Sequence, residues 1–245
     1  MFHIATTPTG SLGLLQVESE ADVVEYLNGL ISAKHRESAA MHVLDAGCGE
    51  RCALEFGPNA IVTGVDISHA LLARNQRLDT RIVADLAHAR LTDGHFDTIV
   101  CWDVLEHLEN PLSALDNLAR SLAPRGMLVL KAPNLHSPKG LVTKYTPYRF
   151  HRWVYRRFDA SDGAMPFPTR FDRSVAAGAL HAWAQAHGLS LRTSAYWEAD
   201  LQMRLRTRLR LRGQVWAVAQ RLVRTLSFGA VDARATDFVL VFEKP

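Results

Sequence analysis

The sequence predicts a single α/β domain built on a doubly wound, mostly parallel sheet. Between residues 41 and 134, short apolar runs that end in acidic residues alternate with segments of helical apolar spacing. This alternation is typical of strand–helix–strand units with right-handed crossovers. A chain of 245 residues that is 48% hydrophobic can bury one substantial core, so we expect one domain over residues 1–245.

Net charge, cysteine count and the length of apolar runs indicate which partners and which cellular compartment to expect. The formal net charge of +3 is too small to indicate a nucleic-acid partner by itself. Cys48, Cys52 and Cys101 are odd in number and form no CxxC motif, which argues against a disulfide framework or a zinc cluster. No apolar run reaches about 18 residues, so no membrane-spanning helix is expected. We therefore expect a cytoplasmic protein.

Residues 1–40 are expected to form a helical cover. The chain as far as Val17 carries Pro8, Gly10 and Gly13 and is expected to be irregular. From Ser19 onward, acids come early, bases come late, and the apolar residues lie on one helical face. These apolar residues are Val23, Val24, Leu27, Leu30 and Ile31. The predicted helix either packs on the sheet or covers the approach to a ligand site.

The first core strand ends in the turn Asp45-Ala46-Gly47-Cys48-Gly49. Glycines here permit positive φ and let a ligand lie against the backbone, and open α/β sheets bind ligands outside these strand ends. A dinucleotide fingerprint would need a third small residue where Cys52 stands. The turn therefore favours a nucleoside with a polar tail over a pyrophosphate. The alternative is a plain strand-to-helix turn, and a short helix is expected at residues 51–56.

Two further predicted strands also end in acids. Asp66 closes the strand at residues 60–66 and lies near the spacing from Gly49 at which a strand-end acid meets a ribose. The alternative is an N-cap for a helix at residues 69–76, a role that Ser68 could fill instead. Asp85 closes the third strand and either accepts from the exocyclic amine of a base or is a turn residue. Carboxylates at one sheet edge repel one another unless hydrogen-bond donors meet them.

The fourth strand, at residues 96–102, runs into the segment Asp103-Val104-Leu105-Glu106-His107. On a helical turn, Asp103, Glu106 and His107 would share a face. A helix follows from Pro111, and a fifth strand is expected at residues 127–131 after a turn at residues 124–126. Because imidazole titrates near neutral pH, His107 is either a candidate base or a hydrogen-bonded structural histidine.

Taken in order, the motifs VLDAGCG, VTGVDIS, VADL, FDTIVCWDVLEHLENP and LAPRGMLVLKAPN resemble the class I S-adenosylmethionine-dependent methyltransferases. The nearest group is the one that includes the ubiquinone-biosynthesis O-methyltransferases. The resemblance covers roughly residues 41–134. It implies a seven-stranded, Rossmann-like sheet with an antiparallel last strand and S-adenosyl-L-methionine as cofactor.

The resemblance also implies which residues of the cofactor-binding core, residues 41–134, hold the cofactor. These are Asp45, Gly47, Cys48 and Gly49 at the methionine and ribose, Asp66 at the ribose hydroxyls, Ile67 against the adenine, Asp85 and Leu86 at the adenine edge, and Cys101 and Trp102 at the methionine end. Many members carry a third glycine where this chain has Arg51, so the loop after Gly49 is expected to take its own path.

Methyl transfer to a hydroxyl requires alignment of the two partners and removal of a proton. Glu106 and His107 are the predicted catalytic residues. Some relatives with an E-x-x-E-H segment bind a divalent ion, whereas this chain has Asp103 at the first position, with His136 as a further potential ligand. Acids at a helix N-terminus are common for dipole reasons alone, and we predict no metal site.

The segment at residues 135–172 is predicted to form a lid or acceptor insert. It mixes bases with aromatic residues between Lys139 and Phe158. This mixture favours an anionic or sugar-bearing acceptor, or else marks a solvated helix whose aromatic residues pack on the core. The C-terminal half, residues 173–245, is expected to hold a helix at 176–187, a strand at 189–197 and a last strand at 237–243, antiparallel beside the fifth.

A basic insertion is expected at residues 200–230. Arginines alternate with apolar residues from Arg204 to Arg212, which fits a strand, but the helical spacing of apolar residues from Val215 to Leu226 favours helix. Its basic amphipathic character allows contact with an anionic membrane surface or a lipid-linked acceptor. The alternative is a solvated face at the subunit interface of a homodimer.

The expected function is therefore S-adenosylmethionine-dependent O-methylation of a small molecule or of a glycan or lipid acceptor. An RNA methyltransferase and a non-catalytic S-adenosylmethionine-binding protein are the alternatives, and a nucleic-acid partner is the less favoured of them. The location is expected to be cytoplasmic, with peripheral membrane contact as an option.

Overall fold

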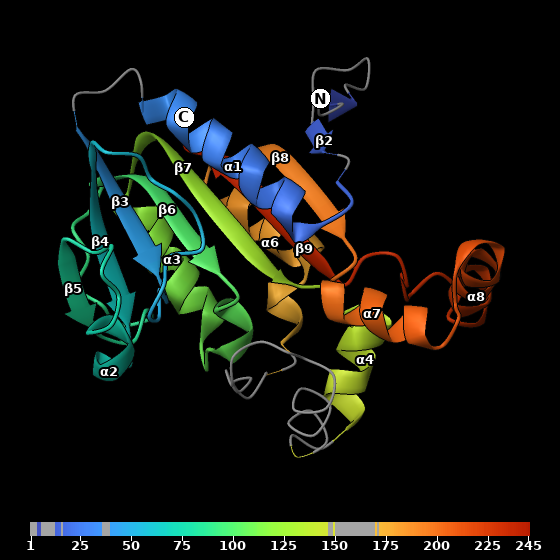
Figure 1. Cartoon of the computed structure of the whole chain (residues 1–245). Coiled ribbons are helices and arrows are strands. Elements are labelled where there is room, and N and C mark those ends of the chain that lie inside the picture. The colour runs from blue at the N-terminus through green and yellow to red at the C-terminus, as the bar shows by residue number, and fades with distance from the viewer. Residues whose placement is uncertain are drawn as a thin grey trace.

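The computed structural model describes residues 4–5, 13–15, 17–35, 40–146, 149, 170 and 172–245. Within them, one nine-stranded sheet has the order β1-β2-β8-β9-β7-β6-β3-β4-β5 (Figure 1). The strands are β1 (Ile4–Ala5), β2 (Gly13–Leu15), β3 (Met41–Ala46), β4 (Ala60–Asp66), β5 (Thr80–Val83), β6 (Phe96–Trp102), β7 (Leu122–Pro133), β8 (Ser190–Trp197) and β9 (Asp237–Glu243).

The central strands pair as the sequence predicts. Strands β7, β6, β3, β4 and β5 are parallel neighbours, and β9 is antiparallel to both β7 and β8. The predicted doubly wound, mostly parallel sheet with an antiparallel last strand is confirmed. The expected turn at residues 124–126 lies within β7, where Arg125 has a φ of 59°.

Two strands were not predicted. Strands β1 and β2 lie in the stretch expected to be irregular, and β2 pairs parallel with the edge strand β8, with Gly13 opposite Thr193. An unpaired sheet edge offers backbone donors and acceptors to any adjacent segment. This pairing therefore depends on the distant strand β8 rather than on a local apolar pattern.

The helices complete the layers. They are α1 (Glu20–His35), α2 (His69–Leu72), α3 (Pro111–Ser121), α4 (Pro138–Tyr145), α6 (Ala177–Ala186), α7 (Asp200–Arg208) and α8 (Gly213–Leu226), with 3-10 turns η1 (Leu105–His107) and η2 (Arg173–Val175). The preference for helix over strand after residue 200 is thus confirmed. No helix among the described residues is long and apolar enough to cross a bilayer.

Two helical expectations are wrong. Residues 51–56 are irregular, because Cys52, Leu54 and Phe56 bury every second side chain, a spacing that a helix cannot provide. The helix expected at 69–76 ends at Leu72, where the N–H groups of Arg74 and Asn75 bond to carbonyls three residues back and the Arg81 guanidinium donates to the carbonyl oxygens of Leu72 and Asn75.

The sheet separates two apolar cores. Helix α1 covers one face, and α3 and α6 cover the other (Figure 1). Alternate residues of β7 point to opposite faces: Met127 and Val129 belong to the core under α1, and Leu128 and Leu130 to the core under α3 and α6. Burial on both faces explains why the central strands are almost continuously apolar.

This topology gathers strand ends at one edge. The parallel strands β3, β4, β5, β6 and β7 all finish there, and β8, antiparallel to β9, finishes there as well. Helix α7 begins three residues after β8 ends, at Asp200. We refer to this side of the sheet as the carboxyl edge.

Candidate active site

The glycine turn leaves β3 at the carboxyl edge. Gly47 and Gly49 have φ of 76° and 52°, the left-handed region that favours glycine. A Cβ on Gly47 would lie 2.4 Å from a methyl of Val104, so packing alone requires glycine there. A Cβ on Gly49 would meet nothing within 4 Å. Only Gly49 therefore has open space in which a ligand could approach the backbone.

The Asp66 carboxylate, at the end of β4, is hydrogen-bonded to the glycine turn that follows β3. One of its carboxylate oxygens accepts from the Gly49 N–H at 2.9 Å, and the other accepts from the Ser68 N–H at 2.8 Å. Ser68, not Asp66, caps helix α2 through the Leu71 N–H. Each carboxylate oxygen keeps a second lone pair for a further donor. The N-cap alternative for Asp66 is thereby removed.

Asp45 is a buried carboxyl group with an unmet acceptor. It is 3% exposed, and its Oδ2 has no hydrogen-bond partner among the described residues. Burial raises its pKa to about 6, although the Cys52 thiol opposes this shift. An unsatisfied buried oxygen of this kind is costly unless a donor reaches it.

Asp85 lies beyond the end of β5 and is exposed. Its Oδ1 accepts from the Ala87 N–H at 2.8 Å, which makes it a turn residue, and its Oδ2 lies 3.9 Å from the His88 imidazole. Leu86 is buried in the core under α3, and its carbonyl accepts from the side chain of Asn117. The Leu86 side chain therefore has little surface left for a ligand.

The other predicted cofactor residues differ in exposure. The Ile67 side chain, next to Asp66, is 75% exposed. An exposed side chain at this position is available to pack against the adenine ring. Cys101 is fully buried in the core, so only its backbone could face a ligand, while Trp102 is half-buried. Cys48 is buried, and burial raises the pKa of its thiol far above the usual range.

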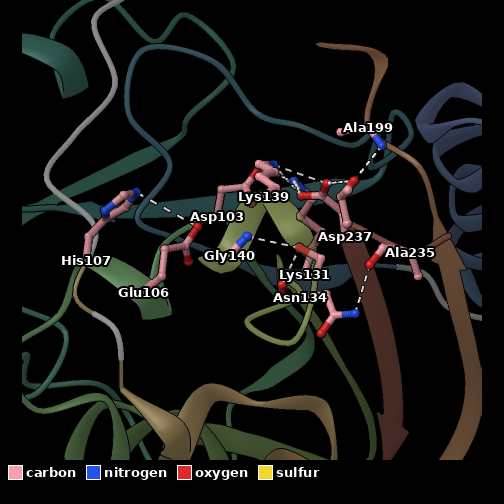
Figure 2. Close-up of polar contacts among 12 residues, drawn as sticks. Asp103, Glu106, His107, Lys131, Asn134, Lys139, Gly140, Ala199, Ala235 and Asp237 are labelled. Carbon is pink, nitrogen blue, oxygen red and sulfur yellow. Dashed lines mark hydrogen bonds and ion pairs between the residues drawn. The ribbon is translucent and has the colours of Figure 1, made fainter. Parts of the chain in front are cut away.

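A cluster of paired charges, which sequence reasoning missed, lies at the carboxyl edge between β6, β7 and β9, with Lys131 and Asp237 buried and the other two members half-buried. We call Asp103, Lys131, Lys139 and Asp237 the charge cluster (Figure 2). Lys131 is buried and pairs with Asp103 and, at 3.4 Å, with Asp237, while the Lys139 ammonium lies 3.1 Å from Asp237. A lysine within the apolar run of β7 was the available signal, since an isolated charge is rarely buried without partners.

The energetics of the charge cluster depend on its pairing. Burial lowers the pKa of Lys131, but the carboxylates of Asp103 and Asp237 outweigh burial and raise it above its ordinary value. Burial acts to raise the pKa of Asp237, but Lys139 and Lys131 hold it below its ordinary value. Asp103 has a φ of 53°, a strained backbone for a non-glycine residue. The pairing thus holds the turn that leads into η1.

Glu106 and His107 lie in η1, on the other side of Asp103 from the lysines (Figure 2). Glu106 is buried, its Oε2 has no hydrogen-bond partner among the described residues, and its Oε1 is 3.9 Å from Nε2 of His107. Burial, and then the negative charge of Asp103, raise the pKa of Glu106 to about 8. A buried carboxyl group whose pKa is raised therefore adjoins an imidazole.

The expectation that Asp103, Glu106 and His107 share one helical face is wrong. Asp103 lies outside η1 with a left-handed backbone, and its carboxylate faces Lys131. His136 is exposed beyond the end of β7. Within the part of the chain that the structure describes, no three His, Cys, Asp or Glu side chains are gathered closely enough to hold a metal ion.

Replacing Glu106 with glutamine should alter how stability depends on pH. A carboxyl whose pKa is raised on folding, from 4.5 to about 8, stabilises the fold below pH 4.5 and loses that contribution as pH rises to 8. Denaturant unfolding at several pH values should show the wild type losing stability relative to Glu106→Gln over this window. The exposed neighbour Glu109, changed to glutamine, should give no such trend. A flat difference for Glu106→Gln would contradict a buried, protonated carboxyl.

Much of the predicted lid lies outside the described residues. Of residues 135–172, the positions 147–148, 150–169 and 171 are not described, and they include most of the basic and aromatic residues on which the RNA alternative depended. Helix α4 is the described start of this segment.

Comparison with known proteins identifies the family. A family described as a methyltransferase domain matches residues 23–194. The ubiquinone biosynthesis O-methyltransferase of Dechloromonas aromatica is 34% identical over 111 residues, which is 41% of this chain and 47% of that protein. The chain spans less than half the length of the first curated relatives that it matches.

Solved structures of low sequence identity share the fold. A putative sarcosine dimethylglycine methyltransferase from Galdieria sulphuraria superposes with a TM-score of 0.57 at 15% identity, covering 93% of this chain and 90% of that one. The magnesium protoporphyrin IX methyltransferase of Synechocystis PCC 6803, solved with bound S-adenosylmethionine, gives a TM-score of 0.52 at 16% identity, covering 91% and 79%. The family match over most of the chain, together with a sheet whose strand ends carry the expected acids, shows that this chain belongs to the class I S-adenosylmethionine-dependent methyltransferases.

Proposed function

We propose that this protein transfers the methyl group of S-adenosylmethionine to a hydroxyl oxygen of a small molecule, free or linked to a glycan or lipid. The observation that carries the proposal is geometric: the His107 imidazole lies beside the buried carboxyl of Glu106 just after β6, at the carboxyl edge where the Asp66 carboxylate keeps free lone pairs. Ubiquinone O-methylation, which the names of several relatives carry, supports oxygen as the acceptor atom.

The residues at the ends of β3 and β4 fit the cofactor. Asp66 is held by two backbone N–H groups, and each of its oxygens keeps a lone pair that can accept from a ribose hydroxyl. Gly49 leaves room for a ligand to approach the backbone, and the buried Asp45 lies on β3 just before that turn. Ile67 is exposed beside them and can pack against the adenine. When bound, S-adenosylmethionine supplies an electrophilic methyl group on a sulfonium.

His107 is the proposed general base. It follows β6 in η1, so an acceptor hydroxyl beside it could pass its proton to the imidazole as the oxygen becomes nucleophilic. Glu106 is buried, and its Oε1 lies 3.9 Å from Nε2 of His107. In this scheme Glu106 therefore acts through the imidazole, as a positioning residue, while His107 removes the proton.

The methyl acceptor can be identified by transferring a labelled methyl group to it. The protein is incubated with S-adenosylmethionine that carries a labelled methyl group and with a cell extract, and the labelled product is identified by mass spectrometry. A product labelled on an oxygen supports the proposal. A product labelled on nitrogen, or no labelled product from any extract, would overturn oxygen methylation.

Replacing His107 with glutamine tests the base. We expect the rate of label transfer to fall by roughly 10²- to 10⁴-fold, the usual contribution of a general base. Binding of S-adenosylhomocysteine, measured by calorimetry, should stay unchanged because His107 has no proposed cofactor contact. His187→Gln is the matched control, since His187 is an exposed histidine at the end of α6, beside the start of β8 and away from the carboxyl edge. A transfer rate equal to that of the wild type would remove His107 from the mechanism.

A further inference from the structure

Helices α7 and α8 form an arm that contributes no residue to either apolar core of the sheet. We call residues 200–230 the basic arm. Neither of its helices buries a side chain, and α8 stands away from the sheet beyond the end of α7 (Figure 1). A 14-residue helix with no buried residue gains little from packing, so its sequence reflects something other than the core.

The basic arm is strongly positive. It holds seven arginines, and its only acid is its first residue, Asp200. Arg206 is neutralised by Glu198 at 2.7 Å and stacks on the Trp216 ring, 5.3 Å from its centroid. The other six are exposed: Arg204, Arg208, Arg210, Arg212, Arg221 and Arg224. The arm is therefore a strongly positive projection on a chain whose net charge is only +3.

Helix α8 also exposes an apolar stripe. Its members follow helical spacing along one face and are Val215, Val218, Leu222 and Leu226. Leu226 is 78% exposed, and Phe228, just beyond the helix, is 98% exposed. A different face, marked by the half-buried Trp216 and Val223, turns toward the rest of the chain. The stripe is thus the side that the described residues leave uncovered.

We propose that the basic arm docks on an anionic membrane surface. A helix with bases on its polar face and aliphatic and aromatic residues on the other lies in the bilayer interface, with the apolar stripe inserted and the arginines among lipid phosphates. A second copy of the chain is disfavoured, because a symmetric contact would bring arginine-rich surfaces together. Bound RNA would leave the aliphatic stripe exposed, since bases stack on aromatic side chains.

Docking has a geometric consequence for the site. The arm leaves β8 at the carboxyl edge, where Asp66, Glu106 and His107 also lie. A docked arm brings that edge to the membrane surface, within reach of amphiphilic molecules. This consequence rests on the proposed methyl transfer, whereas docking itself does not.

The test uses sedimentation of the full chain with lipid vesicles. We expect binding to vesicles containing about one-third phosphatidylglycerol, little binding to phosphatidylcholine alone, and weakening by salt. Arg221→Gln/Arg224→Gln should lower the partition coefficient by about 30-fold, given roughly fivefold for each base near the surface. Arg90→Gln/Arg192→Gln removes two exposed arginines elsewhere and should change it little. Leu222→Ser/Leu226→Ser should also abolish most binding, whereas Leu112→Ser on α3 should not.

Several outcomes would overturn the proposal. They are absence of binding to anionic vesicles, equal loss in the arm variants and their controls, and a wild-type dimer that Leu222→Ser/Leu226→Ser converts to monomer. Binding to single-stranded RNA that survives loss of the leucines and exceeds vesicle binding would assign the arm to nucleic acid instead. Vesicle binding requires no methyl transfer, so failure of docking and failure of the proposed function are separate results.

Discussion

Asp66→Ala should abolish binding of S-adenosylhomocysteine measured by isothermal titration calorimetry. A carboxylate that accepts from two ribose hydroxyls gains roughly 1.5–3 kcal/mol for each hydrogen bond to its charge, so affinity should fall by at least about 100-fold. The two backbone N–H groups that hold Asp66 in place, those of Gly49 and Ser68, would also lose their acceptor and loosen the glycine turn. Both effects act in the same direction.

Asp79→Ala is the matched control for this experiment. Asp79 also accepts a backbone N–H from β4, that of Val62 at 2.7 Å, but away from the carboxyl edge. We expect a similar loss of stability and unchanged binding of S-adenosylhomocysteine. If Asp66→Ala bound the ligand as tightly as Asp79→Ala, the ribose would have to lie elsewhere, and the proposed cofactor site would be wrong.

Lys131→Met should destabilise the fold by more than about 1 kcal/mol and by up to about 3–5 kcal/mol, the usual loss for a fully buried ion pair, since Asp237 is buried but keeps Lys139 and Asp103 is 40% exposed. Methionine retains the packing of the side-chain stem but leaves Asp103 without its lysine and Asp237 with Lys139 alone. The measurement is the free energy of unfolding in denaturant at pH 7. Arg74→Met, which breaks an exposed pair with Glu50, should change it by less than about 1 kcal/mol.

A second substitution shows at which carboxylate the loss arises. If the cost arises at Asp103, adding Asp103→Asn to Lys131→Met should recover part of the stability, because the half-buried neutral amide needs no cation beside it. If the double variant is no more stable than Lys131→Met alone, the loss arises at Asp237, the buried carboxylate that Lys131 also faces. A loss within about 1 kcal/mol in the single variant would show that water or Lys139 already compensates the carboxylates.

Local pattern was enough to predict the parallel core. Apolar runs ending in Asp45, Asp66 and Asp85 predicted three adjacent strands because burial on both faces makes such runs nearly continuous. The helical spacing after Arg212 correctly outweighed the strand-like alternation of the arginines. Residues 51–56 and the N-terminal strands were predicted wrongly, since their conformation depends on burial against distant segments and on pairing with β8.

The sequence alone determined the order of the strands in the chain, the acids at their ends and the family, since these follow from local apolar spacing and from motifs. Only the tertiary structure decided which carboxyl groups are satisfied. It joins Asp66 to the glycine turn, leaves an oxygen of Asp45 without a hydrogen-bond partner among the residues it describes, and pairs Asp103 with Lys131 rather than with Glu106 and His107. Such pairings join residues that are distant in the chain, and burial and charge settle them only after the sheet has brought the strand ends together.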